Sequence, residues 1–354
     1  MRRFRASRRV ASRPKGLRMR VVVTGGAGYI GSVVVARLVG SGHAVTVVDD
    51  LSKGHRDAIA RGAELAVCDL GDAAELASIL KAFAPDAVVH LAARSLVGES
   101  MTIPGTYYRQ NVTNTLNVLE AMDATGCKSI VFSSTAAVYG EPGLAVGGPG
   151  IVEETPTGPT NVYGETKLAA ERMIGWYGAT RGFRTIVLRY FNASGAVGGL
   201  GEDHRPEAHL IPNVLRVALG QAPNLAIFGC DHPTPDGTPI RDYVHVSDLA
   251  AAHIRALEVL DAGTVRNDTL NLGSGSGFSV AHIVETARRV TGHAIPTVSA
   301  DRRAGDPPTL VASGARARTI LGWNPTQSSI EAIIGSAWKW HKEHPHGYSE
   351  SREV

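Results

Sequence analysis

A glycine-rich turn between an apolar run and a helical run limits the possible folds of this chain more than any other feature. Residues 19–31 read MRVVVTGGAGYIG, with Gly25, Gly28 and Gly31 at three-residue spacing. In such a turn the first glycine permits a tight bend, the second lets the backbone approach a pyrophosphate, and the third lets helix and strand pack closely. The segment therefore predicts a dinucleotide-binding strand, turn and helix, with Tyr29 and Ile30 among the cofactor contacts.

The next apolar run ends in acidic residues, which supports this prediction. Asp49 and Asp50 follow the run 45–48 and lie 18 and 19 residues after Gly31, close to the roughly 20 expected for an acid that binds the adenosine ribose. Asp49 is the better placed to accept hydrogen bonds from both ribose hydroxyls. Because its carboxylate would repel a 2′-phosphate, the sequence favours NAD over NADP. The alternative for Asp49 is a solvated loop acid.

Short β-branched runs alternate with helical patterns, which predicts an α/β fold built on a doubly wound parallel sheet. The runs are 20–23, 45–49, 64–68, 87–91, 129–133 and 185–189. Asp72 and Glu75 form a capping box that predicts a helix through Phe83. We expect a basic, disordered extension at 1–18, an NAD-binding Rossmann domain at 19–190 and a smaller α/β substrate-binding lobe at 191–348, parts of which pack back on the Rossmann domain. The polar end after His341 is expected to be frayed.

The distribution of charge argues against a nucleic-acid partner. Nine of the 36 Lys and Arg residues fall within residues 1–20, so the remainder has 27 against 33 Asp and Glu residues. The body of the protein is therefore acidic, whereas a nucleic-acid partner needs a basic folded surface. The basic segment resembles a transit peptide. For this segment we favour, over a transit peptide, either a disordered arm or an upstream extension of a protein whose functional start is Met19.

Composition further indicates a protein of a reducing compartment, without a membrane span. No stretch has the roughly 18 uninterrupted apolar residues that a span requires. The chain has three cysteines, Cys68, Cys127 and Cys230, which are widely spaced. This spacing indicates neither a disulfide framework nor a cysteine-based zinc site, and we expect no metal. A cytoplasmic location fits these features.

A tyrosine and a lysine four residues apart suggest the catalytic chemistry. In NVYGETK, Tyr163 and Lys167 open a helical run through Met173 and project from one face. A neighbouring ammonium group favours the phenolate form of a tyrosine and makes it a better base near neutral pH. The spacing also occurs in amphipathic helices with a solvent-directed lysine. The strand 129–133 delivers Ser134 and Thr135 at its carboxyl end, where hydroxyls reach the ligand crevice, and a Thr/Tyr/Lys trio beside NAD suits hydride transfer at a secondary alcohol.

These residues resemble the extended short-chain dehydrogenase/reductases, and within them the UDP-galactose (UDP-glucose) 4-epimerases. The resemblance covers nearly the whole chain, about residues 19–347. It rests on TGGAGYIGS, VGES (97–100), FSSTAAVYGE (132–141), YGETK, LRYFNASGA (188–196), LAIFG (225–229), DGTPIRDYVHVSDLA (236–250), NLGSG (271–275) and RRAGD (302–306), in that order. It implies an isomerase of galactose metabolism with tightly bound NAD, in which the C4 hydride of a UDP-hexose is taken and returned to the other face of a 4-keto sugar.

The resemblance also implies roles for individual residues. Tyr163 is the acid/base, Lys167 binds the nicotinamide ribose and lowers the tyrosine pKa, Thr135 hydrogen-bonds the sugar 4-hydroxyl, and Asn111 supports the active-site helix. The implied cofactor contacts are Gly25, Gly28, Tyr29, Ile30, Gly31, Asp49, Asp50, Asp69, Leu70, Leu91, Ala92, Ala93, Asn111, Tyr163, Lys167 and Phe191. The implied substrate contacts are Thr135, Asn192, His209, Leu210, Ala226, Phe228, Arg241, Arg303 and Asp306. A homodimer formed through two helices of the cofactor lobe is implied as well.

Several positions depart from the family pattern or allow another interpretation. Ser95 falls where many members have a lysine, His209 replaces a frequent asparagine, and Thr135 replaces the usual serine. Leu310 falls where the pocket is bounded near the sugar 2-substituent, so the choice among hexoses, N-acetylhexosamines and pentoses stays open. By spacing alone, Arg241 would pair with Asp242 or Asp248 on a surface strand and Arg303 would be a loop cation beside Asp306.

Three other functions compete with 4-epimerisation of UDP-galactose. A related UDP-sugar epimerase would act on UDP-xylose or UDP-arabinose, UDP-N-acetylglucosamine or UDP-glucuronate. A nucleotide-sugar 4,6-dehydratase would have Asp and Glu directly after the threonine, where this chain has Ala136 and Ala137. A non-catalytic dinucleotide sensor would typically lack the pair formed here by Tyr163 and Lys167.

Overall fold

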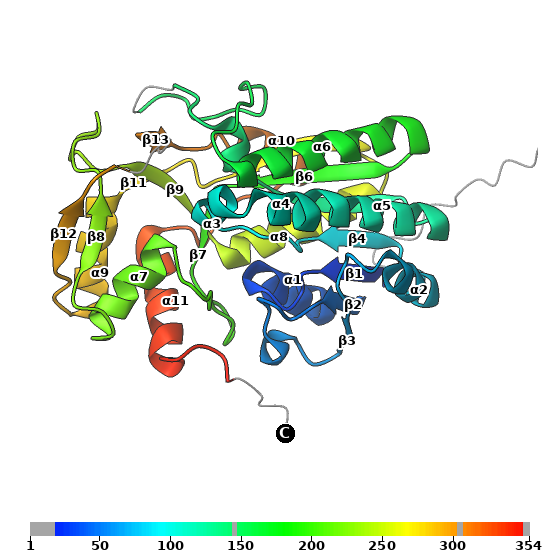
Figure 1. The fold of residues 1–354 in the computed structure, drawn as a ribbon, viewed down its shortest axis with the longest axis horizontal. Helices are drawn as coiled ribbons and strands as arrows, with labels where there is room; N and C mark the ends of the chain where they lie inside the picture. The colour runs from blue at the N-terminus through cyan, green and yellow to red at the C-terminus, as the bar shows by residue number, and fades with distance from the viewer. Residues whose placement is uncertain (1–17, 144–146, 303–306, 350–354) are drawn as a thin grey trace, which may run out of the picture.

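Seven parallel strands form the main sheet (Figure 1). The structure is a computed structural model and describes residues 18–143, 147–302 and 307–349. In sheet order the strands are β10 (Asn267–Leu272), β6 (Arg184–Tyr190), β5 (Ser129–Thr135), β4 (Ala87–His90), β1 (Arg20–Thr24), β2 (Ala44–Asp49) and β3 (Ala63–Val67). All neighbours pair in parallel. The predicted doubly wound fold is confirmed, and the six predicted strands agree with the structure to within two residues at each end.

The order of the strands reverses at the centre of the sheet. The chain runs outward from β1 to β2 and β3 and then returns to place β4 on the other side of β1. At such a switch point the connections leave in opposite directions, which opens a crevice beyond the carboxyl ends of the strands. Thr24 ends β1 and His90 ends β4, so the glycine turn that begins at Gly25 lies at this crevice.

Helices cover both faces of the main sheet. The helices α1 (Tyr29–Gly40) and α8 (Val246–Asp261) pack on one face with Val21 and Val23. The helices α2 (Ala73–Phe83), α5 (Asn114–Thr125) and α6 (Val162–Arg181) pack on the other with Val22. This alternation along β1 is the period of a strand buried on both faces. The predicted capping box is confirmed at its first residue, since the carboxylate of Asp72 accepts a hydrogen bond of 2.9 Å from the amide of Glu75.

A smaller lobe follows β6 and holds short elements, at the left of Figure 1. Its strand β9 (Ile240–His245) pairs with β7 (Asn192–Ser194), β11 (Gly277–Ser279) and β13 (Thr309–Leu310), and β8 (Leu225–Phe228) pairs with β12 (Thr297–Ala300). The helices α7 (Leu210–Ala218), α9 (Val280–Thr291) and α11 (Ile330–Glu343) share an apolar core. Later in the chain, helix α8 packs on the main sheet and strand β10 pairs with β6 at its edge. The division of the chain at residue 190 stays a prediction.

Short helical elements complete the described fold. They are α3 (Val97–Thr102), α4 (Pro104–Tyr107), α10 (Ala315–Leu321), the 3₁₀ turns η1 (Arg56–Ala58) and η3 (Ala136–Tyr139), and the π-helical turn η2 (Tyr108–Thr113). The turn η3 directly follows β5 and faces the start of α6. These two elements bring the predicted catalytic residues together.

The end of the described chain is packed, so the expectation of a frayed end after His341 is wrong for residues 342–349. Helix α11 continues to Glu343, and the ring of His344 stacks on Trp340 with centroids 4.9 Å apart. Tyr348 is buried, and its hydroxyl accepts a hydrogen bond of 3.0 Å from the amide of Gly201. The packing of three aromatic rings, those of Trp340, His344 and Tyr348, therefore fixes a segment whose sequence is largely polar.

Candidate active site

The glycine turn is shaped by close approaches that leave no room for a side chain. Gly25 has a φ of +72°, and a Cβ atom there would lie 2.5 Å from the backbone nitrogen of Ala92 at the end of β4. A Cβ atom on Gly31 would lie 2.0 Å from the carbonyl oxygen of Gly25. Gly28 is the N-cap of α1, which has no side-chain cap and no acidic residue in its first turn. The first amides of α1 thus remain available for an anion at the positive end of the helix dipole.

Asp49 ends β2 beside this turn and is buried. Its two carboxylate oxygens accept hydrogen bonds from the amides of Ala27 (3.0 Å) and Leu51 (2.9 Å). At 8% exposure it is not the solvated loop acid that was the alternative. Burial raises the pKa of this carboxyl group, and the two amide hydrogen bonds oppose the rise. Asp50, in contrast, is exposed and accepts hydrogen bonds from Ser52.

The carboxyl end of β4 forms the next wall of the cleft. Leu91 and Ala92 both donate backbone hydrogen bonds to the carbonyl of Thr24, at 3.0 and 3.1 Å, which ties β4 to β1. The buried side chain of His90 contacts Thr24 and Thr115 through its two ring nitrogens, at 2.6 and 2.9 Å. Burial lowers the pKa of His90 to about 3, with a contribution from Lys167, so the imidazole is neutral at physiological pH.

Asn111 lies behind this wall. Its carbonyl oxygen accepts a hydrogen bond of 2.8 Å from the amide of Arg94, and its amide nitrogen donates to the carbonyl of Arg94 and to Thr166, each at 3.0 Å. Thr166 belongs to α6, one residue before Lys167. The side chain therefore links the chain after β4 to the helix that carries the predicted catalytic pair.

Tyr163 and Lys167 lie in the first two turns of α6, as their spacing predicts. The helix is capped by Asn161, whose side chain accepts a hydrogen bond of 2.8 Å from the amide of Gly164. A Cβ atom on Gly164 would lie 2.6 Å from the carbonyl oxygen of Ala137, so glycine allows α6 to approach η3. This approach brings Tyr163 into hydrogen-bond contact with Thr135.

Lys167 is buried, which excludes the alternative of a lysine directed toward solvent. It is 2% exposed, and its Nζ donates a hydrogen bond of 2.7 Å to the carbonyl of Ser133 and lies 4.8 Å from the centre of the Phe132 ring. Burial lowers the pKa of Lys167 to about 7, and Glu171 opposes this shift. Burial also raises the pKa of Tyr163 to about 12, against the hydrogen bond with Thr135. Without a further positive charge, Tyr163 is therefore a phenol.

A buried ion pair lies one helical turn beyond Lys167. The carboxylate of Glu171 binds Arg189 of β6 through two contacts, Oε2 to Nη2 at 2.6 Å and Oε1 to Nε at 3.0 Å. Ser134 donates to the same carboxylate. Arg189 donates a further hydrogen bond of 2.9 Å to the hydroxyl of Tyr139, which donates to Asn271 of β10 at 2.7 Å. The network joins α6 to three strands of the main sheet.

One cleft with a volume of about 1320 Å³ is lined by residues of both lobes. It contains every predicted cofactor and substrate residue that the structure describes, except Asn111 and Phe191. Phe191 is buried in a small apolar cluster with Ala136 and Leu168. Drug-sized ligands occupy pockets of roughly 300–1,000 Å³, so the volume of this cleft is sufficient for two ligands.

The small lobe supplies the predicted substrate residues. Asn192 lies on β7, Leu210 at the start of α7, Ala226 and Phe228 on β8, and Arg241 on β9; all of them line the cleft. His209, which also lines it, contacts the carboxylates of Glu202 and Glu207 through Nδ1, at 2.8 and 2.9 Å. Arg303 and Asp306 lie outside the described residues.

Spacing alone suggests that Arg241 pairs with Asp242 or Asp248, but both carboxylates accept hydrogen bonds from other groups. The carboxylate of Asp242 accepts hydrogen bonds from Ser274, Gly275 and Ala312. That of Asp248 accepts hydrogen bonds from residues 326–328. The guanidinium group of Arg241 donates to the carbonyls of Ile240 and Pro307, each at 2.7 Å.

Some residues of the cleft had no prediction from the sequence. Lys53, in the loop after β2, and Asn161, the cap of α6, both line it. Asn161 precedes the helical run that holds the Tyr/Lys pair, so a capping preference could have identified it. Lys53 has no comparable signal. Within the described residues, no helix is long and apolar enough to cross a membrane.

The cleft fits NAD at the glycine turn. The uncapped amides of α1 face the position of an anion, no acidic residue lies in the first turn, and the carboxylate of Asp49 lies at the end of the adjacent strand. Asp69 and Leu70, after β3, continue this wall toward the place predicted for the adenine. Donor groups for a pyrophosphate and an acceptor for a ribose are thus arranged in the order in which a dinucleotide presents these groups.

Comparison with known proteins assigns the chain to a family. Residues 21–273 match the model described as the NAD dependent epimerase/dehydratase family. A UDP-glucose 4-epimerase from Halalkalibacterium halodurans is 52% identical over 333 residues, which cover 94% of this chain and 98% of that protein. A UDP-glucose 4-epimerase from Lacticaseibacillus casei is 48% identical over 334 residues, which cover 94% of this chain and 99% of that protein.

Solved structures give the same result. A crystal structure of a UDP-glucose 4-epimerase matches with a TM-score of 0.89 and 50% identity, covering 94% of this chain and all of that chain. A UDP-glucose 4-epimerase from Brucella ovis, crystallised in complex with NAD, matches with a TM-score of 0.87 and 44% identity, covering 91% and 98%.

Proposed function

We propose, from the premise that this chain belongs to the NAD-dependent epimerase/dehydratase family, that it interconverts UDP-galactose and UDP-glucose as a UDP-glucose 4-epimerase. It is an isomerase, its cofactor is NAD, and its place is in galactose metabolism. The observation that supports this reaction most strongly is the position of Thr135, Tyr163 and Lys167 in one cleft with the glycine turn and with α7, β8 and β9.

The cofactor site is built from the main sheet. The amides at the start of α1 bind the pyrophosphate, Asp49 accepts hydrogen bonds from the adenosine ribose, and Asp69 and Leu70 flank the adenine. Ala92 and Ala93 cover the pyrophosphate from the end of β4. Bound NAD supplies a hydride acceptor and donor and, in its oxidised form, a positive charge near Tyr163.

Tyr163 moves the proton of the sugar 4-hydroxyl. Because burial raises its pKa to about 12, it acts as a base only when positive charge nearby favours the phenolate. Lys167, one turn along the same helix and with a pKa that burial lowers to about 7, supplies part of that charge in its protonated form. Thr135, in contact with Tyr163, hydrogen-bonds the 4-hydroxyl and keeps it within reach of the phenolate oxygen.

Substrate orientation comes from the small lobe. The planar guanidinium group of Arg241 suits bidentate contact with diphosphate oxygens, and the contacts from Arg303 and Asp306 remain predictions. Ala226 and Phe228 lie two residues apart on β8 and so share one face of the strand, where they offer an apolar surface for the uridine. His209 and Leu210 line the same part of the cleft and contribute further contacts to the substrate.

The absence of carboxylates after Thr135 disfavours the dehydratase. Ala136 and Ala137 occupy the first two positions of η3, so these positions offer no acid/base pair for the elimination of water. A catalytically inactive sensor is disfavoured by the presence of the Tyr/Lys pair in the cleft.

The proposal is tested by incubating purified protein with UDP-galactose in the absence of added reductant. We expect UDP-glucose to accumulate to equilibrium, because the hydride is returned to the sugar. Parallel incubations with UDP-N-acetylglucosamine, UDP-xylose and UDP-glucuronate identify the sugars that are accepted beside Leu310. No conversion of UDP-galactose by protein that demonstrably contains NAD would contradict the proposal.

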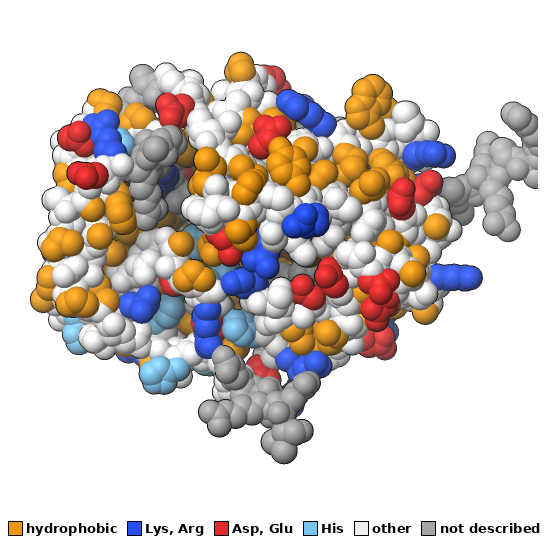
Figure 2. Space-filling view, in the orientation of Figure 1, with side chains coloured by type: hydrophobic (Ala, Val, Ile, Leu, Met, Phe, Trp, Pro, Cys, Tyr) orange, Lys and Arg blue, Asp and Glu red, His pale blue; other side chains and the backbone are white. Residues whose placement is uncertain are grey.

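We also propose that two copies associate through α5 and α6. Large apolar side chains are exposed around these helices, with Trp176 of α6 66% exposed, Met101 of α3 58% and Tyr108 of η2 44%. Figure 2 shows hydrophobic side chains gathered over this side of the molecule. A homodimer would bury this surface. Light scattering should give twice the chain mass, and Trp176→Glu should weaken association; a monomer at high concentration would contradict the proposal.

A cytoplasmic location is the remaining proposal. All three cysteines are free thiols, with Cys68 and Cys127 buried and Cys230 exposed. Free thiols persist in a reducing compartment. Fractionation of source cells should recover the protein with soluble cytoplasmic markers, and recovery with an extracellular or membrane fraction would contradict this location.

A further inference from the structure

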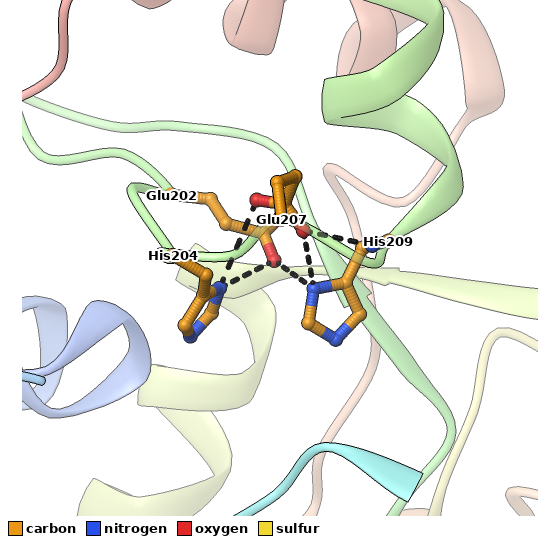
Figure 3. Close-up of side chains that lie close together, drawn as sticks. All are labelled: Glu202, His204, Glu207 and His209. Atoms are coloured by element: carbon orange, nitrogen blue, oxygen red, sulfur yellow. Dashed lines mark hydrogen bonds and ion pairs between the residues drawn. The ribbon is translucent and has the colours of Figure 1, made fainter. Parts of the chain in front are cut away.

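Two glutamates and two histidines converge on the segment that leads into α7. Glu202, His204, Glu207 and His209 each direct one potential ligand atom toward a common centre, and these atoms all lie within 4.8 Å of one another (Figure 3). The imidazoles lie on either side of the Glu202 carboxylate and both present Nδ1 to it, at 3.1 Å for His204 and 2.8 Å for His209. Glu207 closes the group, with Oε1 2.9 Å from Nδ1 of His209.

We propose that this cluster is a binding site for a divalent transition metal, with Zn²⁺ as the best fit. Two carboxylate oxygens and two imidazole nitrogens are a donor set that zinc accepts, and imidazole favours zinc over magnesium or calcium. Four ligands about 2.1 Å from a tetrahedral zinc ion lie about 3.4 Å apart. The contacts of 2.8 to 3.1 Å around Glu202 reach that spacing through small side-chain rotations.

Burial and charge favour a cation at this place. The side chains of Glu202 and Glu207 are only 5% and 8% exposed, whereas those of His204 and His209 are 24% and 44% exposed, so two buried carboxylates face imidazoles that are partly open to solvent. With neutral imidazoles the group would carry two uncompensated negative charges, which is costly in such an environment. A dication bound between the four ligands removes this cost. The competing arrangement retains protons on the histidines as ion pairs, and the experiment below separates the two.

The ligands are also held in place by neighbouring groups. The Glu207 carboxylate accepts hydrogen bonds from the amides of Ala208 (2.8 Å) and His209 (2.7 Å). The ring of His204 lies edge-on to Tyr29 of α1, with centroids 6.3 Å apart. Such support fixes the orientation of a metal ligand before the metal binds.

The site lies where the two lobes meet. Lys53, after β2, donates a hydrogen bond of 2.7 Å to the carbonyl of Arg205, and His55 contacts the carbonyl of Asp203 at 3.1 Å. A metal here would hold the segment 202–209 in register between that loop and α7. If the proposed function is correct, a metal on Nδ1 of His209 also leaves the ring proton on Nε2, which then serves as a donor to the substrate.

The experiment measures metal content and not activity. Protein freed of any affinity tag is analysed for zinc by mass spectrometry, then stripped with a chelator and titrated with Zn²⁺, Mn²⁺, Mg²⁺ and Ca²⁺. We expect one zinc per chain, and an increase in Tm of about 4 °C at a zinc concentration a hundredfold above Kd. These readouts do not depend on the reaction, so failure of the metal site and failure of the proposed function are distinguishable.

The variants are His204→Gln and Glu207→Gln, with His293→Gln, an exposed histidine of the small lobe, as the matched control. Both ligand variants should bind zinc at least about tenfold more weakly, and the control should bind it as the original chain does. Zinc-free protein that gains no Tm on titration would overturn the proposal, as would preference for Mg²⁺ or Ca²⁺ or equal zinc affinity in all variants. Should a ligand variant fail to fold, the proposal is still tested by the zinc content of the original chain and by its Tm after zinc is removed and added back.

Discussion

Removal of the Glu171 carboxylate tests whether the buried ion pair beneath the active site stabilises the fold. Glu171 and Arg189 are each 8% exposed as side chains. Glu171→Ala leaves the guanidinium group with its hydrogen bond to Tyr139 but without the two carboxylate contacts of 2.6 and 3.0 Å. A buried cation that loses its partner is costly because neither water nor another anion replaces it.

The expected loss of stability follows from this geometry. Breaking a buried pair from one side costs about 3–5 kcal/mol, and we expect the lower value, about 3 kcal/mol, because Tyr139 still accepts a hydrogen bond. For a chain of this size that corresponds to a decrease in Tm of about 4 °C. Urea unfolding followed by circular dichroism measures the free energy of unfolding, and calorimetry measures Tm.

Two further variants make the result specific. Glu258→Ala breaks the exposed pair between Arg255 and Glu258, whose side chains are 57% and 52% exposed, and should cost less than about 1 kcal/mol. The double variant Glu171→Met/Arg189→Met removes both buried charges and should be more stable than Glu171→Ala. The reasoning is refuted if Glu171→Ala costs no more than Glu258→Ala, or if the double variant is the least stable.

Three other perturbations have defined outcomes. Gly31→Ala places a Cβ atom 2.0 Å from the carbonyl oxygen of Gly25, so the protein should copurify with little NAD and be less stable; normal NAD content would contradict this. Asp49→Ser removes the charge that repels a 2′-phosphate and should improve binding of NADP relative to NAD by about tenfold in calorimetric titration of cofactor-free protein; an unchanged ratio would argue against the ribose contact. Below pH 6.5 an unfolded histidine binds a proton, whereas burial lowers the pKa of His90 to about 3. As the pH falls between these two values, His90 therefore lowers the free energy of unfolding by about 1.4 kcal/mol per pH unit. The slope of stability against pH should be smaller by that amount in His90→Asn, and an identical slope would contradict the assignment.

Features with a local signal were predictable from the sequence. The glycine turn, the helix α2 with its cap at Asp72 and the position of Asp49 at a strand end each follow from a few neighbouring residues. The strand β10 was not predicted because four of the six residues in its segment, NDTLNL, are polar. The polar side chain of Asn271 can be buried because it accepts a hydrogen bond from Tyr139, a partner more than a hundred residues away.

Interactions between distant residues explain the remainder of what was missed. Glu171 and Arg189 are 18 residues apart on a helix and a strand, and although Arg189 ends a predicted strand, no local pattern pairs it with Glu171. Lys167 is held by the backbone carbonyl of Ser133, which no side-chain pattern reveals. The convergence of four ligand atoms on the segment before α7 likewise depends on how that loop folds.

The central claim is that one bound NAD takes a hydride from C4 of the sugar and returns it to the same carbon. The most direct test uses UDP-galactose with deuterium at C4, incubated with the purified protein in ordinary water without added cofactor. We predict that UDP-glucose forms with the deuterium retained at C4, as measured by mass spectrometry and NMR. Product that has lost the label to solvent, or a requirement for free NAD to regenerate activity after each turnover, would contradict the claim.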